Sequence, residues 1–289
     1  MKNNTIISNL LGDENNKRLS SYIASPVLVK NDYVEDADII LLDTTYSGKD
    51  FEQIMHKSGP RVLLISHHEF EKVLFDYLCK YHLNHVIGQE SLVLDREFQM
   101  HLNYKLTNTW PTIPSMLYPD SEIAEITIRD SKLIDESLDC LFNRVIIGPF
   151  FDSPIGYLRV LGNELLMNAF FSSQYNNKSR SEKIVLDCDI ELSLGVDENF
   201  LVLSVKDPFG TLSRNQLIKS LERGFREKTP VHKSGGAGLG LYMTLLSTNQ
   251  IIINVKPNHY TEIICVIDRS KRIKTFKGRT TSFNLYEGV

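Results

Sequence analysis

Two polar residues, Glu164 and Asn168, lie one helical turn apart in the stretch "NELLMNA" (163–169). Glu164 and Asn168 are separated by four positions, so on a helix their side chains project from one face. An amide oxygen on such a face can coordinate Mg²⁺, and a neighbouring carboxylate can accept a proton or orient a nucleophile. The same pair is also typical of the solvent-facing side of an amphipathic helix. Taken alone, the stretch favours this second interpretation.

A second polar signal closes the apolar run "VLSVKDPFG" (202–210). Asp207 stands at the end of a predicted strand, with Gly210 three residues later. A carboxylate in such a place can accept a hydrogen bond from the exocyclic amine of a purine. An ordinary Asp-Pro turn is the alternative, and the segment by itself is a weak indication of a site.

The third signal is a glycine loop, "KSGGAGLGLYM" (233–243), which holds four of the 16 glycines of the chain. Glycines let oxygen atoms approach the main chain, and the helix predicted from Leu239 offers unpaired N–H groups at its positive end. The loop is not a Walker motif, because no Lys-Ser or Lys-Thr follows it, and Leu241 breaks the pattern GxGxxG. A hinge that allows close helix packing is the other interpretation, and the loop alone leaves both open.

The order and spacing of the three motifs resemble the GHKL ATPase superfamily, which includes histidine kinases, gyrase, heat-shock chaperones and bacterial anti-sigma serine kinases. "NELLMNA" resembles the N box, "DPFG" a degenerate DxGxG box, and "GGAGLGL" the second glycine box of histidine kinases. The resemblance covers about residues 125 to 268 and implies a Bergerat-type fold that binds ATP and Mg²⁺.

The resemblance also implies a role for each matching residue. Asn168 would coordinate Mg²⁺ and Glu164 would act as the catalytic general base. Asp207 would read adenine, and Gly210 would belong to the same nucleotide site. The triphosphate would contact the residues of the glycine box, which are Gly236, Gly238, Leu239 and Gly240.

The segment 211–234 between the second and third motifs would form the ATP lid. Four of its cations could meet phosphate charge or remain solvated, namely Arg223, Arg226, Lys228 and Lys233. Phe209 replaces the first glycine of DxGxG, Pro208 removes a backbone donor, and Phe171 stands where many histidine kinases carry a charged residue. These departures favour ATP binding over ATP turnover.

The first 90 residues alternate between short apolar strands and helices, which predicts a small parallel sheet with helical crossovers. This half resembles the receiver domains of two-component systems. Asp43 ends a predicted strand as the phosphoacceptor would, Ser66 ends the next strand, and Asp13 with Glu14 could stand for the acidic metal-binding pair. No Lys occupies the expected position in "NHVIGQES", so we expect a pseudo-receiver. A turn residue is an equally good interpretation of Asp43.

The predicted fold class is therefore α/β: a flavodoxin-like, receiver-type domain followed by a two-layer α/β sandwich. We place the receiver-like domain at 1–90, a connector with a proline-rich segment at 91–122, and the ATP-binding domain at 123–289, including a basic tail, "RSKRIKTFKGR" (269–279). The tail is solvated or docks on an acidic partner, with nucleic-acid contact as the third interpretation.

Composition narrows the function classes. The net charge of −4 gives no global field that would attract nucleic acid or an anionic membrane. The four cysteines show no CxxC pairing, which argues against a zinc site or a disulfide framework. The sequence shows neither a secretory signal nor an apolar stretch long enough to cross a bilayer, so we expect a cytoplasmic protein.

These observations together predict a signalling regulator that binds ATP and Mg²⁺ and acts on a protein partner. The partner would be a sigma factor, an anti-sigma antagonist or a response-regulator-like protein, and a homodimer is compatible with the sequence. The regulator would either phosphorylate a Ser or Thr of that partner or act as a non-catalytic, nucleotide-dependent binding switch. An ATP-hydrolysing conformational machine is a third interpretation.

Overall fold

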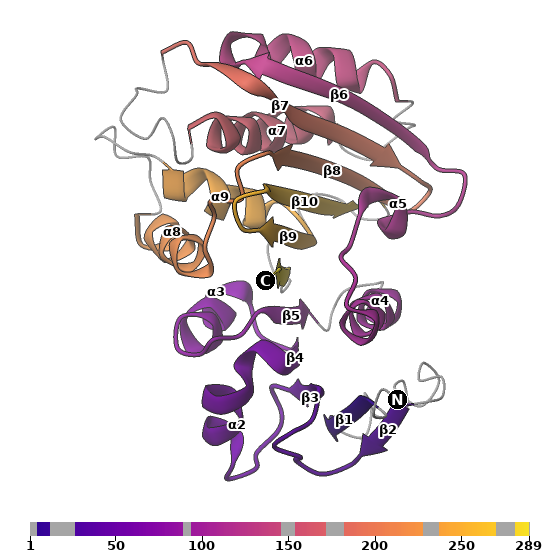
Figure 1. Ribbon diagram of the computed structural model, residues 1–289, viewed down its shortest axis with the longest axis vertical. Helices are drawn as coiled ribbons and strands as arrows, with labels where there is room; N and C mark the ends of the chain where they lie inside the picture. The colour runs from indigo at the N-terminus through magenta and orange to yellow at the C-terminus, as the bar shows by residue number, and fades with distance from the viewer. Residues whose placement is uncertain are drawn as a thin grey trace. The chain divides into compact units, whose positions relative to one another are not determined.

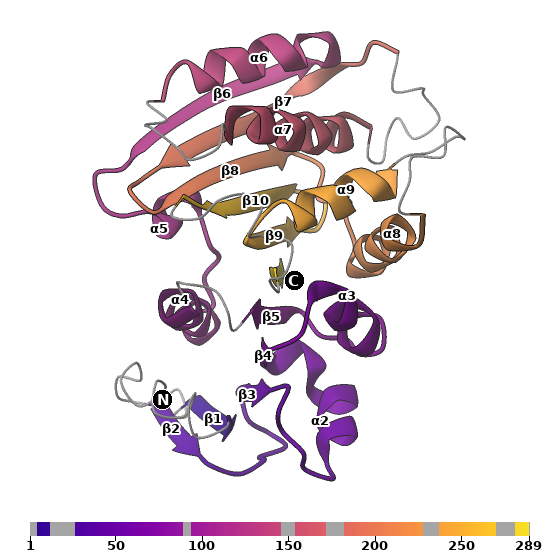
Figure 2. The same ribbon diagram turned by 180° about the vertical axis from the view of Figure 1, so that it is seen from behind.

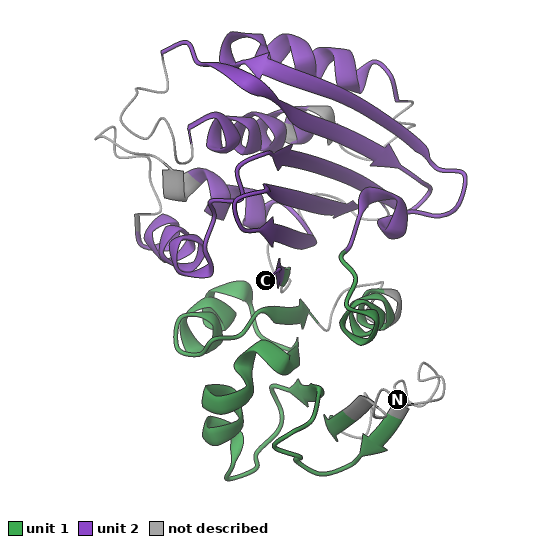
Figure 3. Ribbon diagram, viewed as in Figure 1, with its two compact units in different colours: residues 1–110, 278–284 green, residues 111–277, 285–289 purple. Residues whose placement is uncertain are grey.

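The computed structural model describes residues 5–11, 27–88, 94–145, 154–171, 182–227, 237–269 and 281–288. It is a mixed α/β structure, as predicted from the sequence (Figures 1 and 2). The chain divides into two compact units (Figure 3). Unit 1 contains residues 1–110 and 278–284, and unit 2 contains residues 111–277 and 285–289. Within the described ranges, no helix combines the length and apolar character needed to cross a membrane.

Unit 1 is built on five parallel strands in the order β2-β1-β3-β4-β5. The apolar runs of β3 and β4 are buried at every position, as expected for a parallel sheet with both faces covered. The strands are β1 (Thr5–Leu10), β2 (Val27–Lys30), β3 (Ile39–Asp43), β4 (Val62–Ser66) and β5 (His85–Gly88). The parallel sheet predicted for this half is confirmed.

Helices cover both faces of the unit 1 sheet. The helices α2 (Phe51–Ser58) and α3 (Phe70–Val73) lie on one side, and α4 (Leu94–Thr107) lies on the other (Figure 1). Phe98 and Leu102 of α4 belong to a buried apolar cluster with residues of β1, β3, β4 and β5. Helix α4 falls within the range 91–122, which we had interpreted as a connector, and this helix was not predicted.

The last strand, β11 (Ser282–Glu287), was not predicted from the sequence. Its first residues pair antiparallel with β5, with Phe283 opposite Val86. The hydroxyl of Ser282 accepts a hydrogen bond of 2.9 Å from the backbone N–H of Gly88. The sheet of unit 1 therefore includes a strand from the far end of the chain. The basic tail predicted just before it lies outside the described residues from position 270 onward.

In the described residues of unit 2, five antiparallel strands follow the order β9-β10-β8-β7-β6. They are β6 (Glu122–Asp130), β7 (Val185–Val196), β8 (Phe200–Asp207), β9 (Gln250–Lys256) and β10 (Tyr260–Asp268). The sequence predicts strands at 125–130, 183–190, 199–207, 251–255 and 261–268, and each of them overlaps one of these five. The strands β6 and β7 extend further than predicted.

The helices of unit 2 gather on one face of its sheet (Figures 1 and 2). They are α6 (Ile134–Phe142), α7 (Pro154–Phe171) and α9 (Ala237–Leu246), with α8 (Arg214–Glu227) packed against α9. The short helix α5 (Ile113–Met116) contacts β7 and β8. A Cβ on Gly162 of α7 would lie 2.5 Å from a methyl group of Leu138, so glycine permits α6 and α7 to pack closely.

Candidate functional site

Helix α7 places the first pair of predicted site residues at the border of the core. Leu161, Leu165 and Leu166 are almost fully buried and fix one side of the helix. Glu164 and Asn168 are half-buried on the adjoining side. They are therefore neither core residues nor fully solvated surface residues, and their polar atoms can reach a ligand at the edge of the helix layer.

The glycine helix α9 meets α7 at Glu164. A Cβ built on Gly240 would overlap the carboxylate of Glu164 and lie only 2.7 Å from its Cδ atom. The carboxylate thus lies directly against the main chain of α9, at the fourth residue of that helix. The fold therefore brings together two of the predicted site residues that are far apart in the sequence.

Asp207 ends β8 and is 8% exposed. Its Oδ1 atom accepts a hydrogen bond of 2.9 Å from the backbone N–H of Phe209. Burial raises the pKa of Asp207 to about 6, although hydrogen bonds from the N–H groups of Phe209, Gly210 and Thr261 lower it in part. The carboxyl group is therefore held in place by main-chain donors and has little contact with solvent.

Gly210 is required by the turn that follows Asp207. Its φ is 59°, in the left-handed region that favours glycine. A Cβ there would lie 2.8 Å from the nitrogen of His259 and 2.9 Å from that of Asn258, and even closer to the carbonyl oxygen of Lys256. The carbonyl of Gly210 also accepts a hydrogen bond of 3.2 Å from the N–H of Asn258. The glycine thus locks the end of β8 against the turn between β9 and β10.

Thr261 of β10 is a residue that the sequence did not single out. It lies directly opposite Asp207 in the register of β10 and β8. Its hydroxyl is buried and has no hydrogen-bond partner within the described parts of the chain. A buried hydroxyl without a partner is costly unless a ligand or water satisfies it. The strand register is the signal that could have identified it, since Asp207 was already a candidate.

The predicted lid contains a helix that was not anticipated. Leu217 and Leu221 of α8 are fully buried, and the ring of Phe225 meets that of Tyr242 of α9 edge-on, with 5.8 Å between centroids. Arg223 is exposed, whereas Arg226 forms an ion pair of 2.6 Å with Glu222 on the same helix. The described part of this segment is therefore anchored on α9 through an apolar stripe.

Part of the glycine loop can be placed. Gly238 and Leu239 lie in the first turn of α9, whereas Gly236, Lys228 and Lys233 lie outside the described residues. Phe209 and Phe171, the two aromatic departures from the family pattern, are each half-buried. The use of Asn168 and Asp207 by one ligand stays a prediction.

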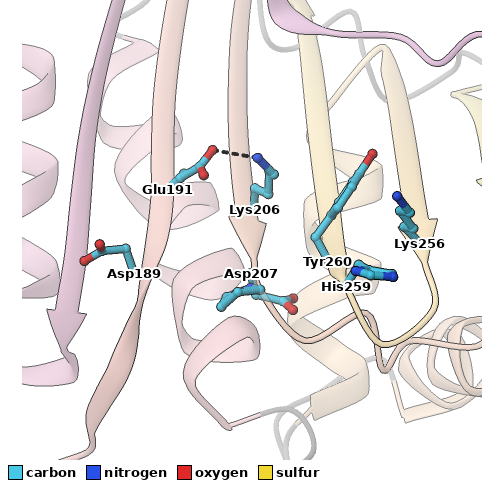
Figure 4. Close-up of a pocket in the computed structure, with 8 residues that line it drawn as sticks. Asp189, Glu191, Lys206, Asp207, Lys256, His259 and Tyr260 are labelled. Atoms are coloured by element: carbon cyan, nitrogen blue, oxygen red, sulfur yellow. Dashed lines mark hydrogen bonds and ion pairs between the residues drawn. The ribbon is translucent and has the colours of Figure 1, made fainter.

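A surface pocket of about 330 Å³ lies beside Asp207 (Figure 4). Lys206 forms an ion pair of 2.9 Å with Glu191, and its Nζ atom lies 5.3 Å from the centre of the Tyr260 ring. Asp189 and His259 also line the pocket. Lys206 and Asp207 are consecutive strand residues, and successive side chains point to opposite faces of a sheet. The pocket face carrying Lys206 is thus distinct from the face on which α7 packs.

In unit 1, the candidate phosphoacceptor Asp43 is 1% exposed. Its Oδ1 atom accepts a hydrogen bond of 2.9 Å from the N–H of Thr45 and another from the Thr45 hydroxyl. Ser66 is fully buried and accepts from the N–H of His68. Asp43 therefore has the contacts of a turn residue, and its phosphorylation stays a prediction. Asp13 and Glu14 lie outside the described residues.

No group of three or more His, Cys, Asp or Glu side chains is arranged to hold a metal ion in the described ranges. The sequence matches no protein-family model. No curated protein is similar enough to the chain to count as a match.

Proposed function

We propose that unit 2 binds ATP and Mg²⁺ in the manner of the GHKL superfamily, within a signalling regulator whose first unit is a pseudo-receiver. The strand order 2-1-3-4-5 of unit 1 is that of flavodoxin-like domains, which supports this proposal for the first unit. Helices on one face of an antiparallel sheet support a Bergerat-type arrangement for the second.

The contact between Glu164 and Gly240 carries the proposal for the nucleotide site. It joins the stretch that resembles the N box to the stretch that resembles the glycine box. A glycine at this point lets an oxygen-bearing group lie against the first turns of α9, where unpaired N–H groups and the helix dipole favour anions. The proposed phosphate position is thus next to the proposed general base.

The donor set suits a magnesium nucleotide. The amide oxygen of Asn168 is a ligand type that Mg²⁺ accepts, and bound Mg²⁺ would neutralise phosphate charge. Asp207 offers an acceptor for the exocyclic amine of adenine, and Thr261 offers a buried hydroxyl beside it. Glu164 would take the proton from an attacking hydroxyl if phosphoryl transfer occurs.

Replacement of Asn168 by alanine is expected to weaken the binding of a fluorescent ATP analogue in the presence of Mg²⁺ by about tenfold or more, because the metal loses a protein ligand. The measurement is an equilibrium titration of the full chain with and without Mg²⁺. The matched control is Asn103→Ala, at an exposed asparagine of α4, which is expected to bind like the wild type. An unchanged affinity of Asn168→Ala would show that the N-box assignment is wrong.

A non-catalytic switch is the second candidate, and Phe209 and Pro208 favour it. A half-buried phenyl ring follows Asp207 within two residues, where the family pattern has glycine. In such a switch, nucleotide binding would change the conformation of the lid, which includes α8. The lid surface would then bind or release a sigma factor or another protein partner.

The variant Glu164→Gln separates the two functions. It is expected to retain nucleotide binding and regulation of the partner if the protein is a switch. Loss of transfer of labelled phosphate to partners captured with ATP, while nucleotide binding persists, would identify a kinase. The readout is phosphate incorporation into the captured partner beside the affinity of that partner for the chain.

A further inference from the structure

One stripe of α4 places three ionisable side chains at the inner side of the helix. Glu97, His101 and Lys105 are spaced by four residues, so they lie above one another on the helix. Glu97 is 3% exposed and His101 is 0% exposed, while Lys105 is half-buried. The stripe runs beside Phe98 and Leu102, which pack in the apolar core of unit 1.

A second buried histidine, His85, lies in β5, the strand that α4 contacts. His85 of β5 is almost fully buried, and its Nδ1 atom lies 3.2 Å from Oδ1 of Asn284 in β11. Burial lowers the pKa of His85 well below its usual value, and the nearby charge of Lys105 and the ring of His101 lower it further. The charge of Lys105 thus acts on both imidazoles.

The charges around these imidazoles suit their neutral forms. Burial, with a smaller contribution from Lys105, lowers the pKa of His101 to about 3. The Nζ atom of Lys105 donates a hydrogen bond of 3.1 Å to the carbonyl of Pro60, and burial lowers its pKa to about 8. Glu97 faces His101 with 4.0 Å between Oε1 and Nε2, and the ring of Tyr104 meets that of His101 edge-on with 6.3 Å between centroids.

We propose that these side chains form an acid-sensitive latch, in which protonation of His85 and His101 releases α4 from the sheet of unit 1. At neutral pH, the latch already holds the cation of Lys105. Two further positive charges would lie near it in a buried site, where an added charge is poorly solvated. Release of α4 would expose His101 of the helix and His85 of β5 to water, where both imidazoles bind protons readily.

Release of α4 would change how the chain is held where it leaves unit 1. The helix ends at Thr107, and unit 2 begins at Pro111, so α4 anchors the chain just before it leaves unit 1. Release would turn the segment after β5 into a longer, flexible tether. The latch uses no residue of the proposed nucleotide site and stands without it.

The sign of the pH dependence follows from the direction of the pKa shifts. A histidine whose pKa is lowered in the folded state stabilises the closed form above its ordinary pKa of about 6.5, and this contribution is lost as the pH falls toward the folded value. For each imidazole, the ratio of released to attached α4 should rise by about tenfold for every pH unit below about 6.5.

Hydrogen exchange of the full chain at pH 7 and pH 5 tests the latch, after correction for the intrinsic pH dependence of exchange. We expect the amides of α4 to lose protection by roughly 30-fold or more, while those of β3 and β4 stay protected. Equal protection of α4 at both pH values would overturn the proposal. A parallel loss in β3 and β4 would also overturn it, because it would indicate global unfolding.

Two variants locate the effect. His101→Leu places an apolar side chain of similar bulk in the buried position. It should remove the contribution of one imidazole, about tenfold per pH unit below about 6.5, from the pH-dependent loss of α4 protection. His82→Gln, at an exposed histidine of the same unit, should leave the sensitivity unchanged. Retention of the full sensitivity in His101→Leu would remove His101 from the latch. If that variant does not fold, the wild-type profile still decides the proposal.

Discussion

Asp207→Asn is expected to weaken ATP binding by about 100-fold while leaving the protein at least as stable as the wild type at pH 7. The loss of affinity follows because the charged acceptor for the adenine amine would be removed, and a hydrogen bond to a charged group contributes up to about 3 kcal/mol. The gain in stability follows from burial, since an ionised carboxylate that is 8% exposed is poorly solvated.

The size of the stability effect follows from the pKa of Asp207. A rise from 3.8 to about 6 corresponds to a cost of about 3 kcal/mol for the ionised form in the folded state at pH 7. Because the pKa is raised on folding, the favourable contribution of Asp207 is present below about pH 4 and is lost as the pH rises through about 6. Asp207→Asn should therefore raise the free energy of unfolding by up to about 3 kcal/mol at pH 7 and leave it unchanged at pH 4.

Denaturant unfolding at pH 4 and pH 7, together with nucleotide titration, measures both effects. Asp189→Asn is the matched control, because Asp189 is an exposed carboxylate of the same sheet that pairs with Arg129 at 2.6 Å. Its loss should change stability by less than about 1 kcal/mol and leave binding intact. Wild-type affinity in Asp207→Asn would rule out Asp207 as the adenine acceptor. Lower stability at pH 7 would show that the three backbone hydrogen bonds outweigh the burial of the charge.

Gly210→Ala is expected to destabilise the protein by about 2–5 kcal/mol. A left-handed backbone costs alanine about 1–2 kcal/mol, and overpacking adds about 1–3 kcal/mol. The obstructing atoms are backbone atoms of Lys256, Asn258 and His259, so no side-chain rotation can relieve the overlap. Displacement of this turn should also disturb Asp207 and weaken nucleotide binding.

Thermal or denaturant unfolding tests this expectation, with Gly156→Ala as the control. A Cβ on Gly156 of α7 meets nothing within 4 Å, so alanine there should be neutral or stabilise the helix by up to about 1 kcal/mol. If Gly210→Ala proves as stable as Gly156→Ala, the turn can adopt another conformation, and the locking role assigned to Gly210 is wrong.

The strands were predictable wherever they are short, apolar and buried on both faces. In β3 and β4 every residue is buried, so the sequence shows an uninterrupted apolar run that ends in a polar residue, Asp43 or Ser66. In β11 the run "SFNLYE" begins with alternating polar and apolar residues, and its polar residues Ser282 and Asn284 are buried against partners such as Gly88 and His85. Those partners are remote in the sequence, so no local pattern reveals the strand.

The candidate site was predictable in residue types but not in contacts. The spacing of Glu164 and Asn168 implied a shared face of α7, and the glycine box implied the start of α9. The approach of Glu164 to Gly240 depends on how two helices pack, and the position of Thr261 beside Asp207 depends on strand register. Helix α8 was missed because few apolar residues, such as Leu217 and Leu221, stand among many polar ones.

The pairing of β5 with β11 sets an order of events during synthesis. Gly88 and its partner Ser282 are separated by 194 residues. At about 5–20 residues per second, the ribosome needs roughly 10 to 40 seconds to make that stretch. During this time the edge of β5 has no β11 beside it, and an open strand edge is a site of aggregation. Unit 1 is thus the first part of the chain to be made, yet its sheet gains its last strand only after nearly all of unit 2 has been translated.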